Sequence, residues 1–264
     1  MTLAADYSLD FLKLLAHDVR WQLLTALAAS DRRVQELVAL LQRPQNLISY
    51  HLRLLREGAV VRERRSSADG RDVYYSLDLD HLRALYLESG QTLHPALACA
   101  KPVTDSTTAA ADTEDTAERP YRILFLCTHN SARSQLAEGI LRAQGGSLVQ
   151  AHSAGSAPGS VHPLAIRAAA AFGIDISRQH SKHMDDFDGQ AFDCVITVCD
   201  RVREACPVFP GDPQQIHWSF SDPAAVTGSE SEQFQAFLQT ARELSTRISY
   251  LRLMIERRAQ NDKE

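Results

Sequence analysis

The sequence lacks the features that would assign the protein to a membrane or secreted class. None of its apolar runs reaches the roughly 18–20 residues that a membrane-spanning helix needs. The N-terminal stretch MTLAADYSLDFLKLL has neither the basic start nor the smooth apolar core of a signal peptide. Five cysteines among 264 residues do not suggest a disulfide framework, and their spacing suits a cytoplasmic protein with reactive thiols. The formal net charge of −5 excludes a surface that is basic overall, so a nucleic-acid contact needs a local basic patch.

Large apolar residues are also missing from residues 103–119, which read VTDSTTAAADTEDTAER. After Val103 this stretch cannot bury enough surface to offset the entropy of ordering it. The sequence therefore predicts two domains, residues 1–100 and 120–264, joined by a flexible acidic linker over residues 101–119.

The first hundred residues show the hydrophobic period of helices. Apolar residues recur at helical spacing over residues 9–15, 19–27 and 34–41. A fourth helix is expected to open at Pro44, since proline is tolerated in a first turn, and to stop at Gly58. Two β-like runs, 60–65 and 72–76, flank the turn sequence ADGR, and residues 80–93 return to helix. This order predicts a mainly α winged helix-turn-helix.

The outward positions of this domain carry groups that suit DNA. Amides, hydroxyls and a guanidinium on the fourth helix can read base edges in a major groove, and the hairpin arginines can contact phosphates. A solvated helical face that contacts nothing is the alternative, but helix, glycine stop and arginine-bearing hairpin occur together in order. The residues expected to contact DNA are Gln45, Asn46, Ser49, Tyr50, His51, Arg53, Arg64, Arg65 and Arg71.

From about Leu14 to Leu85 the sequence resembles the ArsR family of small bacterial repressors, notably in LLAHDVRWQLLTAL, ISYHLRLLREGAVV and RDVYYSL. The resemblance implies a homodimer, formed through the N-terminal domain, on a palindromic DNA operator and released by a metal or metalloid. Arsenite-sensing relatives often carry a cysteine pair on the helix before the recognition helix, but residues 33–41 contain neither Cys nor His. Cys99 alone cannot supply the three thiolates that trivalent arsenic prefers, so the inducer site is not evident.

Strand and helix patterns alternate after the linker. The runs RILFL, SLVQAHSAG, FDCVITVC and QIHWSF are expected strands, and a long helix from Phe234 to Leu251 closes the chain. Such alternation predicts an α/β domain with a parallel four-stranded sheet covered by helices.

Cys127 ends the first of these strands, where parallel sheets bind their ligands. The following backbone is expected to form an anion nest in which Arg133 grips a tetrahedral oxyanion, while the positive field and Ser134 favour the Cys127 thiolate. The alternative without a function is that Cys127 is simply a buried cysteine and Ser134 a helix-capping residue. The oxyanion-binding residues expected are Thr128, His129, Asn130, Ser131, Ala132 and Arg133.

Cys127, five residues, then Arg133 and Ser134 resemble the low-molecular-weight protein tyrosine phosphatase fold, and the resemblance extends over residues 120–255. It implies that Asp222, followed by Pro223, is the general acid. Phosphatases of this fold usually have Tyr after Asp-Pro and a second Cys in the anion loop, where this chain has Ala224 and Ala132.

Cys199 and Cys206 instead match the thioredoxin-coupled arsenate reductases of this fold. The resemblance implies a relay in which Cys127 attacks arsenate, Cys199 attacks Cys127 to release arsenite, and Cys206 attacks Cys199. Thioredoxin or another thiol donor then reduces the Cys199–Cys206 disulfide. The catalytic set expected is Cys127, Asn130, Arg133, Ser134, Cys199, Cys206 and Asp222.

No metal ligands and no tightly bound cofactor are expected. Some reductases of this family bind potassium, and Asn130, Glu138, Ser153 and Ser181 stand at matching positions. Since His183 stands where an aspartate ligand would be expected, potassium is doubtful.

Three hypotheses stay open from the sequence. The first is an arsenate reductase fused to an arsenic-responsive DNA-binding repressor. The second is a phosphatase acting on phosphotyrosine or a small phosphoester, tethered to a regulator. The third is a regulator that is not an enzyme, in which Cys127, Cys199 and Cys206 sense arsenic or redox state.

Overall fold

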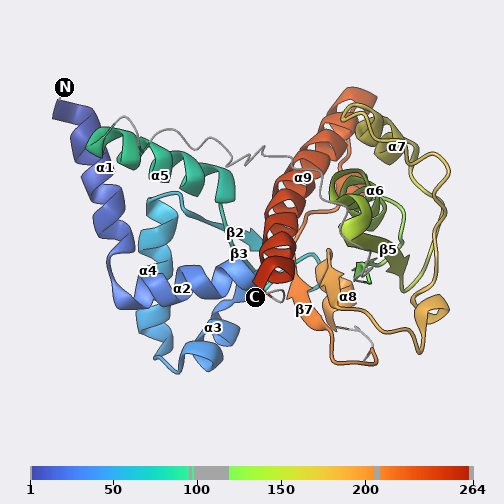
Figure 1. Ribbon diagram of the computed structural model, residues 1–264, viewed down its shortest axis with the longest axis horizontal. Coiled ribbons are helices and arrows are strands. Elements are labelled where there is room, and N and C mark those ends of the chain that lie inside the picture. Colours follow the sequence, from blue (N-terminus) through green and yellow to red (C-terminus); the bar gives the residue numbers. More distant parts are fainter. Residues whose placement is uncertain (1, 95–96, 98–118, 205–208, 262–264) are drawn as a thin grey trace, which may run out of the picture. The chain divides into compact units, whose positions relative to one another are not determined.

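The computed structural model describes residues 2–94, 97, 119–204 and 209–261 (Figure 1). The chain forms two compact units. The first comprises Met1–Ala28, Val34–Glu63 and Leu77–Arg119, and the second comprises Ala29–Arg33, Arg64–Ser76 and Pro120–Glu264. Two short segments from the first hundred residues therefore belong to the same unit as the C-terminal part of the chain. The expected linker lies outside the described residues except for Arg119, so the domain boundaries stay predictions.

The first unit is helical, as the periodicity predicts. Its helices are α1 (Thr2–Leu15), α2 (Asp18–Ala29), α3 (Val34–Leu41), α4 (Gln45–Glu57) and α5 (Leu79–Leu93). The helix α1 packs against α5, and α3 packs against α4. Leu23 on α2, Leu37 on α3, and Ile48 and Leu52 on α4 are completely buried, so the apolar stripe of each helix is its buried face.

Gly58 ends α4 as expected, but it does not adopt the left-handed backbone conformation that glycine often has after a helix. It caps α4, and its N–H donates to the Leu54 carbonyl at 3.0 Å, but its own φ is −79°. The left-handed residue is Ala59, with φ of 54°. A Cβ at position 58 would collide with the side chain of Leu14. The atom it would meet is the end of the flexible Leu14 side chain, so an alanine at position 58 would require that side chain to shift.

A small antiparallel sheet is formed by one short strand before α3 and two strands after α4. Its strands are β1 (Arg32–Arg33), β2 (Val61–Arg65) and β3 (Val73–Leu77), in the order β1-β3-β2. The predicted hairpin is thus confirmed. The strand β1 was not expected from the sequence, because two residues are too few to show a hydrophobic period. It pairs with β3, with Arg32 opposite Tyr75 and Arg33 opposite Tyr74.

A parallel four-stranded sheet forms the centre of the second unit, as predicted. Its strands are β4 (Tyr121–Cys127), β5 (Val149–Gly155), β6 (Cys194–Thr197) and β7 (Gln214–His217), in the order β5-β4-β6-β7. All three neighbouring pairs are parallel. The last strand ends at His217, earlier than the run QIHWSF suggests.

Helices cover this sheet, and because β4 and β6 pair in parallel, their carboxyl ends lie at the same edge. The helices are α6 (Arg133–Gly145), α7 (Pro163–Ala170), α8 (Asp200–Glu204) and α9 (Glu230–Asn261). The long helix α9, drawn in red in Figure 1, packs against α6 and α7. Its Phe237, Ala241, Leu244 and Ile248 join the buried core with the strand residues. No helix within the described ranges combines the length and hydrophobicity that a bilayer span requires.

Candidate active site and DNA-facing surface

The loop after β4 wraps its backbone around a buried thiol. Cys127 ends β4 and is 2% exposed, and α6 begins six residues later at Arg133. The turn between them needs a left-handed residue, and Asn130 supplies it with φ of 45°. As a result the Asn130 N–H donates to Cys127 Sγ at 3.1 Å, and the Ser134 hydroxyl lies 2.9 Å from the same sulfur. We call Cys127–Arg133 the anion loop.

The side chain of Asn130 fixes the shape of the anion loop from inside. Its Nδ2 donates to the hydroxyls of Ser134 and Ser153, each at 2.8 Å. Its Oδ1 accepts from Gln135 Nε2 at 2.9 Å and from the Lys182 N–H at 2.8 Å. Asn130 is completely buried, and every one of these bonds forms without competition from water. Sequence reasoning expected Asn130 in the site but did not single out Gln135, for which periodicity offered no signal.

Gly155 is a second residue of the site that the sequence pattern does not indicate; it ends β5 beside the anion loop. A Cβ at this position would lie 2.6 Å from the Thr128 carbonyl oxygen and 2.8 Å from the Asn130 nitrogen. Both neighbours are backbone atoms that cannot rotate away. The signal was a glycine at the end of a predicted strand, a place where another backbone often approaches closely.

Burial has the largest effect on the Cys127 thiol and raises its pKa above the ordinary value. The charge of Arg133 and the hydrogen bond with Ser134 lower the pKa, while the nearby Cys199 raises it. The net direction is upward. The Arg133 charge and the Ser134 hydroxyl therefore act toward the thiolate, as expected, but burial outweighs them because the buried sulfur has lost the water that would solvate a thiolate.

Replacing Ser134 with alanine is expected to raise the pKa of Cys127 further, because the hydrogen bond that favours the thiolate is lost. At a pH below the pKa, less thiolate then forms, so alkylation is expected to be several-fold slower than in the wild type. The measurement is the pH dependence of iodoacetamide labelling of Cys127, followed by peptide mass spectrometry. Ser131→Ala, in the same loop, is the matched control. An unchanged midpoint in Ser134→Ala would contradict the role of this hydroxyl.

Arg133 and Asp222 face each other beside the anion loop. Arg133 Nη2 lies 2.9 Å from Asp222 Oδ2, and Nη1 donates to the Phe220 carbonyl at 3.2 Å. Arg133 is buried, whereas the Asp222 side chain is about one-third exposed at 32%. The carboxylate also caps the short helix Pro223–Ala225 by accepting from the Ala224 N–H at 3.1 Å. The fold thus brings together Arg133 and Asp222, two residues that are far apart in the sequence and that were both expected in the site.

The second thiol of the expected relay lies against the anion loop. Cys199 follows β6, is 1% exposed, and its Sγ lies 3.4 Å from Thr128 Oγ1. Cys206 lies outside the described residues. A further buried thiol, Cys194, sits on β6 itself, where burial raises its pKa to about 12.

The remaining residues of the anion loop have mainly backbone roles. His129 Nδ1 lies 3.1 Å from the Ala157 carbonyl oxygen, and the Ser131 carbonyl accepts from the His162 N–H at 2.8 Å. Ala132 occupies the N-cap of α6. These contacts tie the anion loop to the segment after β5.

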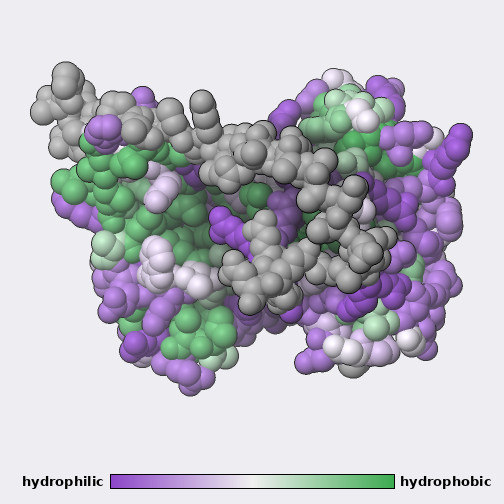
Figure 2. Space-filling view, viewed as in Figure 1, coloured by the Kyte–Doolittle hydropathy of each residue, from purple (hydrophilic) through white to green (hydrophobic). Residues whose placement is uncertain are grey.

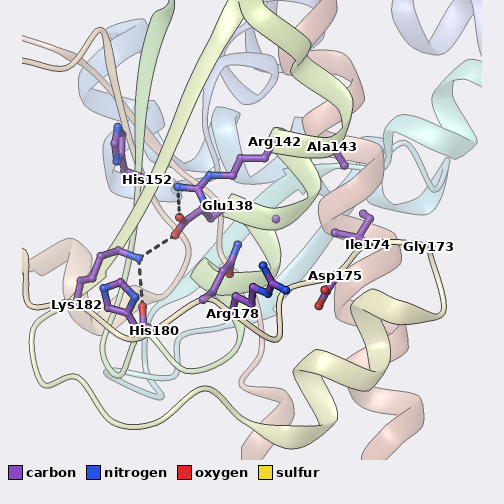
Figure 3. A pocket seen from close by; sticks show the side chains of 12 residues that line it. Glu138, Arg142, Ala143, His152, Gly173, Ile174, Asp175, Arg178, His180 and Lys182 are labelled. Carbon is purple, nitrogen blue, oxygen red and sulfur yellow. Dashed lines mark hydrogen bonds and ion pairs between the residues drawn. The ribbon is translucent and has the colours of Figure 1, made fainter.

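The residues around Glu138 do not fit a potassium site. The buried Glu138 carboxylate accepts from the Ser153 hydroxyl, pairs with Lys182 Nζ at 3.2 Å and with Arg142 Nη2 at 2.6 Å. Figure 3 shows the Lys182 and Arg142 side chains converging on Glu138 in a pocket. Two cationic side chains already balance the one carboxylate. His183 turns its Nε2 toward the Ser156 carbonyl at 3.0 Å instead.

Among the described residues there is no group of three or more His, Cys, Asp or Glu side chains that could hold a metal ion.

Five of the six residues expected on the outward face of α4 are exposed. They are Gln45, Asn46, Ser49, Tyr50 and Arg53. His51 is a correction, because it is only 3% exposed and its ring packs against His17 at a centroid distance of 4.4 Å. Position 51 lies next to the buried Leu52 and Ile48 on the inner face of the helix, so its ring cannot read a base.

The hairpin arginines are not equivalent. Arg65 is exposed and donates to the Gly70 carbonyl at 3.3 Å, and the Arg71 side chain is 93% exposed. Arg64 instead pairs with the buried Asp200 at 2.5 Å. Its guanidinium is occupied within the second unit, which the sequence did not indicate.

Residues 122–260 match the family described as low molecular weight phosphotyrosine protein phosphatase, and the chain belongs to this family. Residues 17–62 match the bacterial regulatory proteins of the arsR family, so an ArsR-type helix-turn-helix precedes the α/β domain. The predicted combination of the two families is confirmed.

Several relatives share the C-terminal part of the chain. An arsenate reductase of Halalkalibacterium halodurans is 39% identical over 126 residues, which are 48% of this chain and 91% of that protein. An arsenate reductase of Bacillus subtilis is 37% identical with the same coverage. Among solved structures, the thioredoxin-dependent arsenate reductase Cg_ArsC1' of Corynebacterium glutamicum is 25% identical, with 89% of this chain and 96% of that chain covered and a TM-score of 0.41.

Proposed function

We propose that the protein is an arsenate reductase, supplied with electrons by thioredoxin or another thiol donor, joined to an arsenic-responsive DNA-binding regulator. The observation that carries this proposal is Cys199, a buried thiol 3.4 Å from Thr128 in the loop that begins at Cys127. Reducing a bound oxyanion requires a second thiol within reach of the first, whereas hydrolysing an ester requires only one. The relatives that cover this domain are named arsenate reductases.

The first step forms a covalent adduct. The anion loop and Arg133 hold arsenate above Cys127, and the Cys127 thiolate attacks the arsenic atom. One oxygen leaves as water, with a proton supplied by Asp222, whose carboxyl group lies 2.9 Å from Arg133. Arsenic is still pentavalent in the resulting thiol–arsenate adduct.

The second step transfers the electrons. The Cys199 thiolate attacks the Cys127 sulfur, a disulfide forms, and the sulfur–arsenic bond breaks with its electron pair remaining on arsenic, which leaves as arsenite. Cys206 then attacks Cys199 and releases Cys127 as a thiolate. Two electrons and two protons from a dithiol donor such as thioredoxin restore Cys199 and Cys206.

A phosphatase is the competing function for this fold, and two residues disfavour it. Ala132 takes the place of the second cysteine that phosphatases usually have in the anion loop, and Ala224 takes the place of tyrosine after Asp-Pro. The chain has instead the relay cysteines Cys199 and Cys206.

The decisive experiment is arsenate-dependent NADPH oxidation with thioredoxin and thioredoxin reductase. We expect the wild type to turn over arsenate and the variants Cys127→Ser, Cys199→Ser and Cys206→Ser to be inactive. Cys194→Ala, which removes a buried thiol outside the relay, is the matched control and should stay active. An inactive wild type that hydrolyses p-nitrophenyl phosphate with Cys127 alone would replace this proposal by the phosphatase. Absence of both activities, with arsenite altering DNA binding only when Cys199 is present, would favour a sensor.

The N-terminal region is proposed to bind a palindromic operator as a homodimer in the cytoplasm. Large apolar side chains remain exposed on the two helices that pack together, among them Tyr7 on α1 and Tyr86 and Leu93 on α5. Figure 2 shows hydrophobic residues gathered over these N-terminal helices. An exposed apolar patch of this kind supports self-association.

The hairpin arginines are expected to differ in their effect on DNA affinity. Arg65→Ala should weaken binding to a mixed-sequence DNA duplex several-fold and reduce its salt dependence, because an exposed cation is lost. Arg64→Ala should change affinity less than twofold, because that guanidinium is occupied by Asp200. The measurement is fluorescence anisotropy over a range of salt concentrations. Equal losses in the two variants would show that Arg64 also reaches the DNA.

A further inference from the structure

Asp200 follows Cys199 directly, and its carboxylate is completely buried at the start of α8. Oδ1 accepts from the Ser219 hydroxyl at 2.8 Å and lies 3.1 Å from His217 Nε2. Burial lowers the pKa of His217, and its Nδ1 lies 2.8 Å from the Thr197 hydroxyl. A neutral His217 that donates from Nε2 leaves the negative charge of Asp200 to be balanced by another group.

Arg64 of β2 supplies the balancing charge. Its Nη2 lies 2.5 Å from Asp200 Oδ2 and also donates to the Ser219 hydroxyl, and its Nε donates to the Ser219 carbonyl at 3.2 Å. The Ser67 N–H and hydroxyl donate to the same carboxylate oxygen at 2.7 and 3.0 Å. Burial alone would raise the pKa of Asp200, but hydrogen bonds from His217 and Ser67 and the charge of Arg64 hold it below its ordinary value. The carboxylate is therefore ionised and tied to the hairpin.

The position of Cys199 depends on this arrangement, since Cys199 and Asp200 are neighbours at the start of a helix of five residues. Removing the cation from a buried pair leaves an uncompensated charge, which α8 can relieve by moving Asp200 toward water. Such a movement carries Cys199 away from Thr128. A displacement of about 1 Å in a reacting group costs on the order of a hundredfold in rate.

We propose that Arg64 is a positioning residue for the thiol relay: through Asp200 it holds Cys199 beside the anion loop. The hairpin segment Arg64–Ser76, which belongs to the same compact unit as the anion loop, thereby takes part in the reduction. The inference rests on the proposed arsenate reduction and concerns its second step, the attack of Cys199 on the Cys127 sulfur. Arg64 contributes neither electrons nor a proton to that step.

The test compares full-length Arg64→Ala, Arg64→Lys and Arg167→Ala in thioredoxin-coupled arsenate turnover. Arg64→Ala is expected to lower kcat at least about tenfold with KM for arsenate within about twofold of wild type, because the anion loop is untouched. Arg64→Lys should recover part of the loss, because lysine keeps the charge. Arg167→Ala removes an exposed arginine paired with Glu230 and should leave kcat unchanged.

A double-mutant cycle separates positioning from a general loss of stability. Asp200→Asn should slow kcat, and Arg64→Ala in that background should slow it no further, because Arg64 acts through Asp200. Wild-type kcat in Arg64→Ala, no recovery by lysine, or additive losses in the double variant would each overturn the inference. None of these results would contradict the proposed function, which fails only if the wild type does not turn over arsenate.

Discussion

A Cys199→Ser variant is expected to lose roughly a thousandfold or more of its thioredoxin-coupled arsenate turnover while still binding arsenate at the anion loop. The serine hydroxyl keeps the small size of the side chain beside Thr128 but cannot form a disulfide with Cys127. The sulfur–arsenic bond of the adduct then has no internal thiol to break it. Binding should survive because Arg133 and the backbone of the anion loop are unchanged.

Two measurements on this variant separate binding from reduction. Arsenate should protect Cys127 from iodoacetamide in both wild type and Cys199→Ser, and arsenite release should occur only in the wild type. Cys194→Ala controls for the loss of a buried thiol as such. Turnover of Cys199→Ser within about tenfold of wild type would mean that an external thiol, and not Cys199, resolves the adduct.

Gly155→Ala is expected to lower kcat/KM for arsenate about a hundredfold and to destabilise the fold by about 1–3 kcal/mol. The added Cβ would meet the Thr128 carbonyl oxygen and the Asn130 nitrogen, both in the backbone of the anion loop. Since β5 is paired along its whole length with β4, the strand cannot move away, and the loop must shift instead. The Asn130 N–H then loses its alignment on Cys127.

Gly159→Ala is the matched control, because a Cβ there meets nothing within 4 Å. Arsenate turnover and thermal unfolding of the two variants would be compared with wild type. Full activity in Gly155→Ala would show that the anion loop tolerates a shift of its backbone, against the close contact described above.

The local part of the site was predictable from the sequence. A buried strand, a loop and an amphipathic helix in succession fix where Cys127 and Arg133 stand, because they are six residues apart in one turn. The helix-turn-helix was predictable for the same reason, since the apolar stripe of α4 determines which side chains remain outward. His51 shows the limit of that reasoning, because it lies at the boundary of the stripe and was assigned to the wrong face.

By itself, the sequence determined the families, the order of the longer helices and strands, and the places of Cys127 and Arg133 at the two ends of the anion loop, all of which depend on neighbours along the chain. Only the tertiary structure decided that Gly155 supports the anion loop, that Lys182 pairs with Glu138, and that Arg64 pairs with Asp200. The last two partners are 44 and 136 residues apart. Such contacts arise when strands and helices pack, and hydrophobic period carries no information on which buried charge will meet which partner.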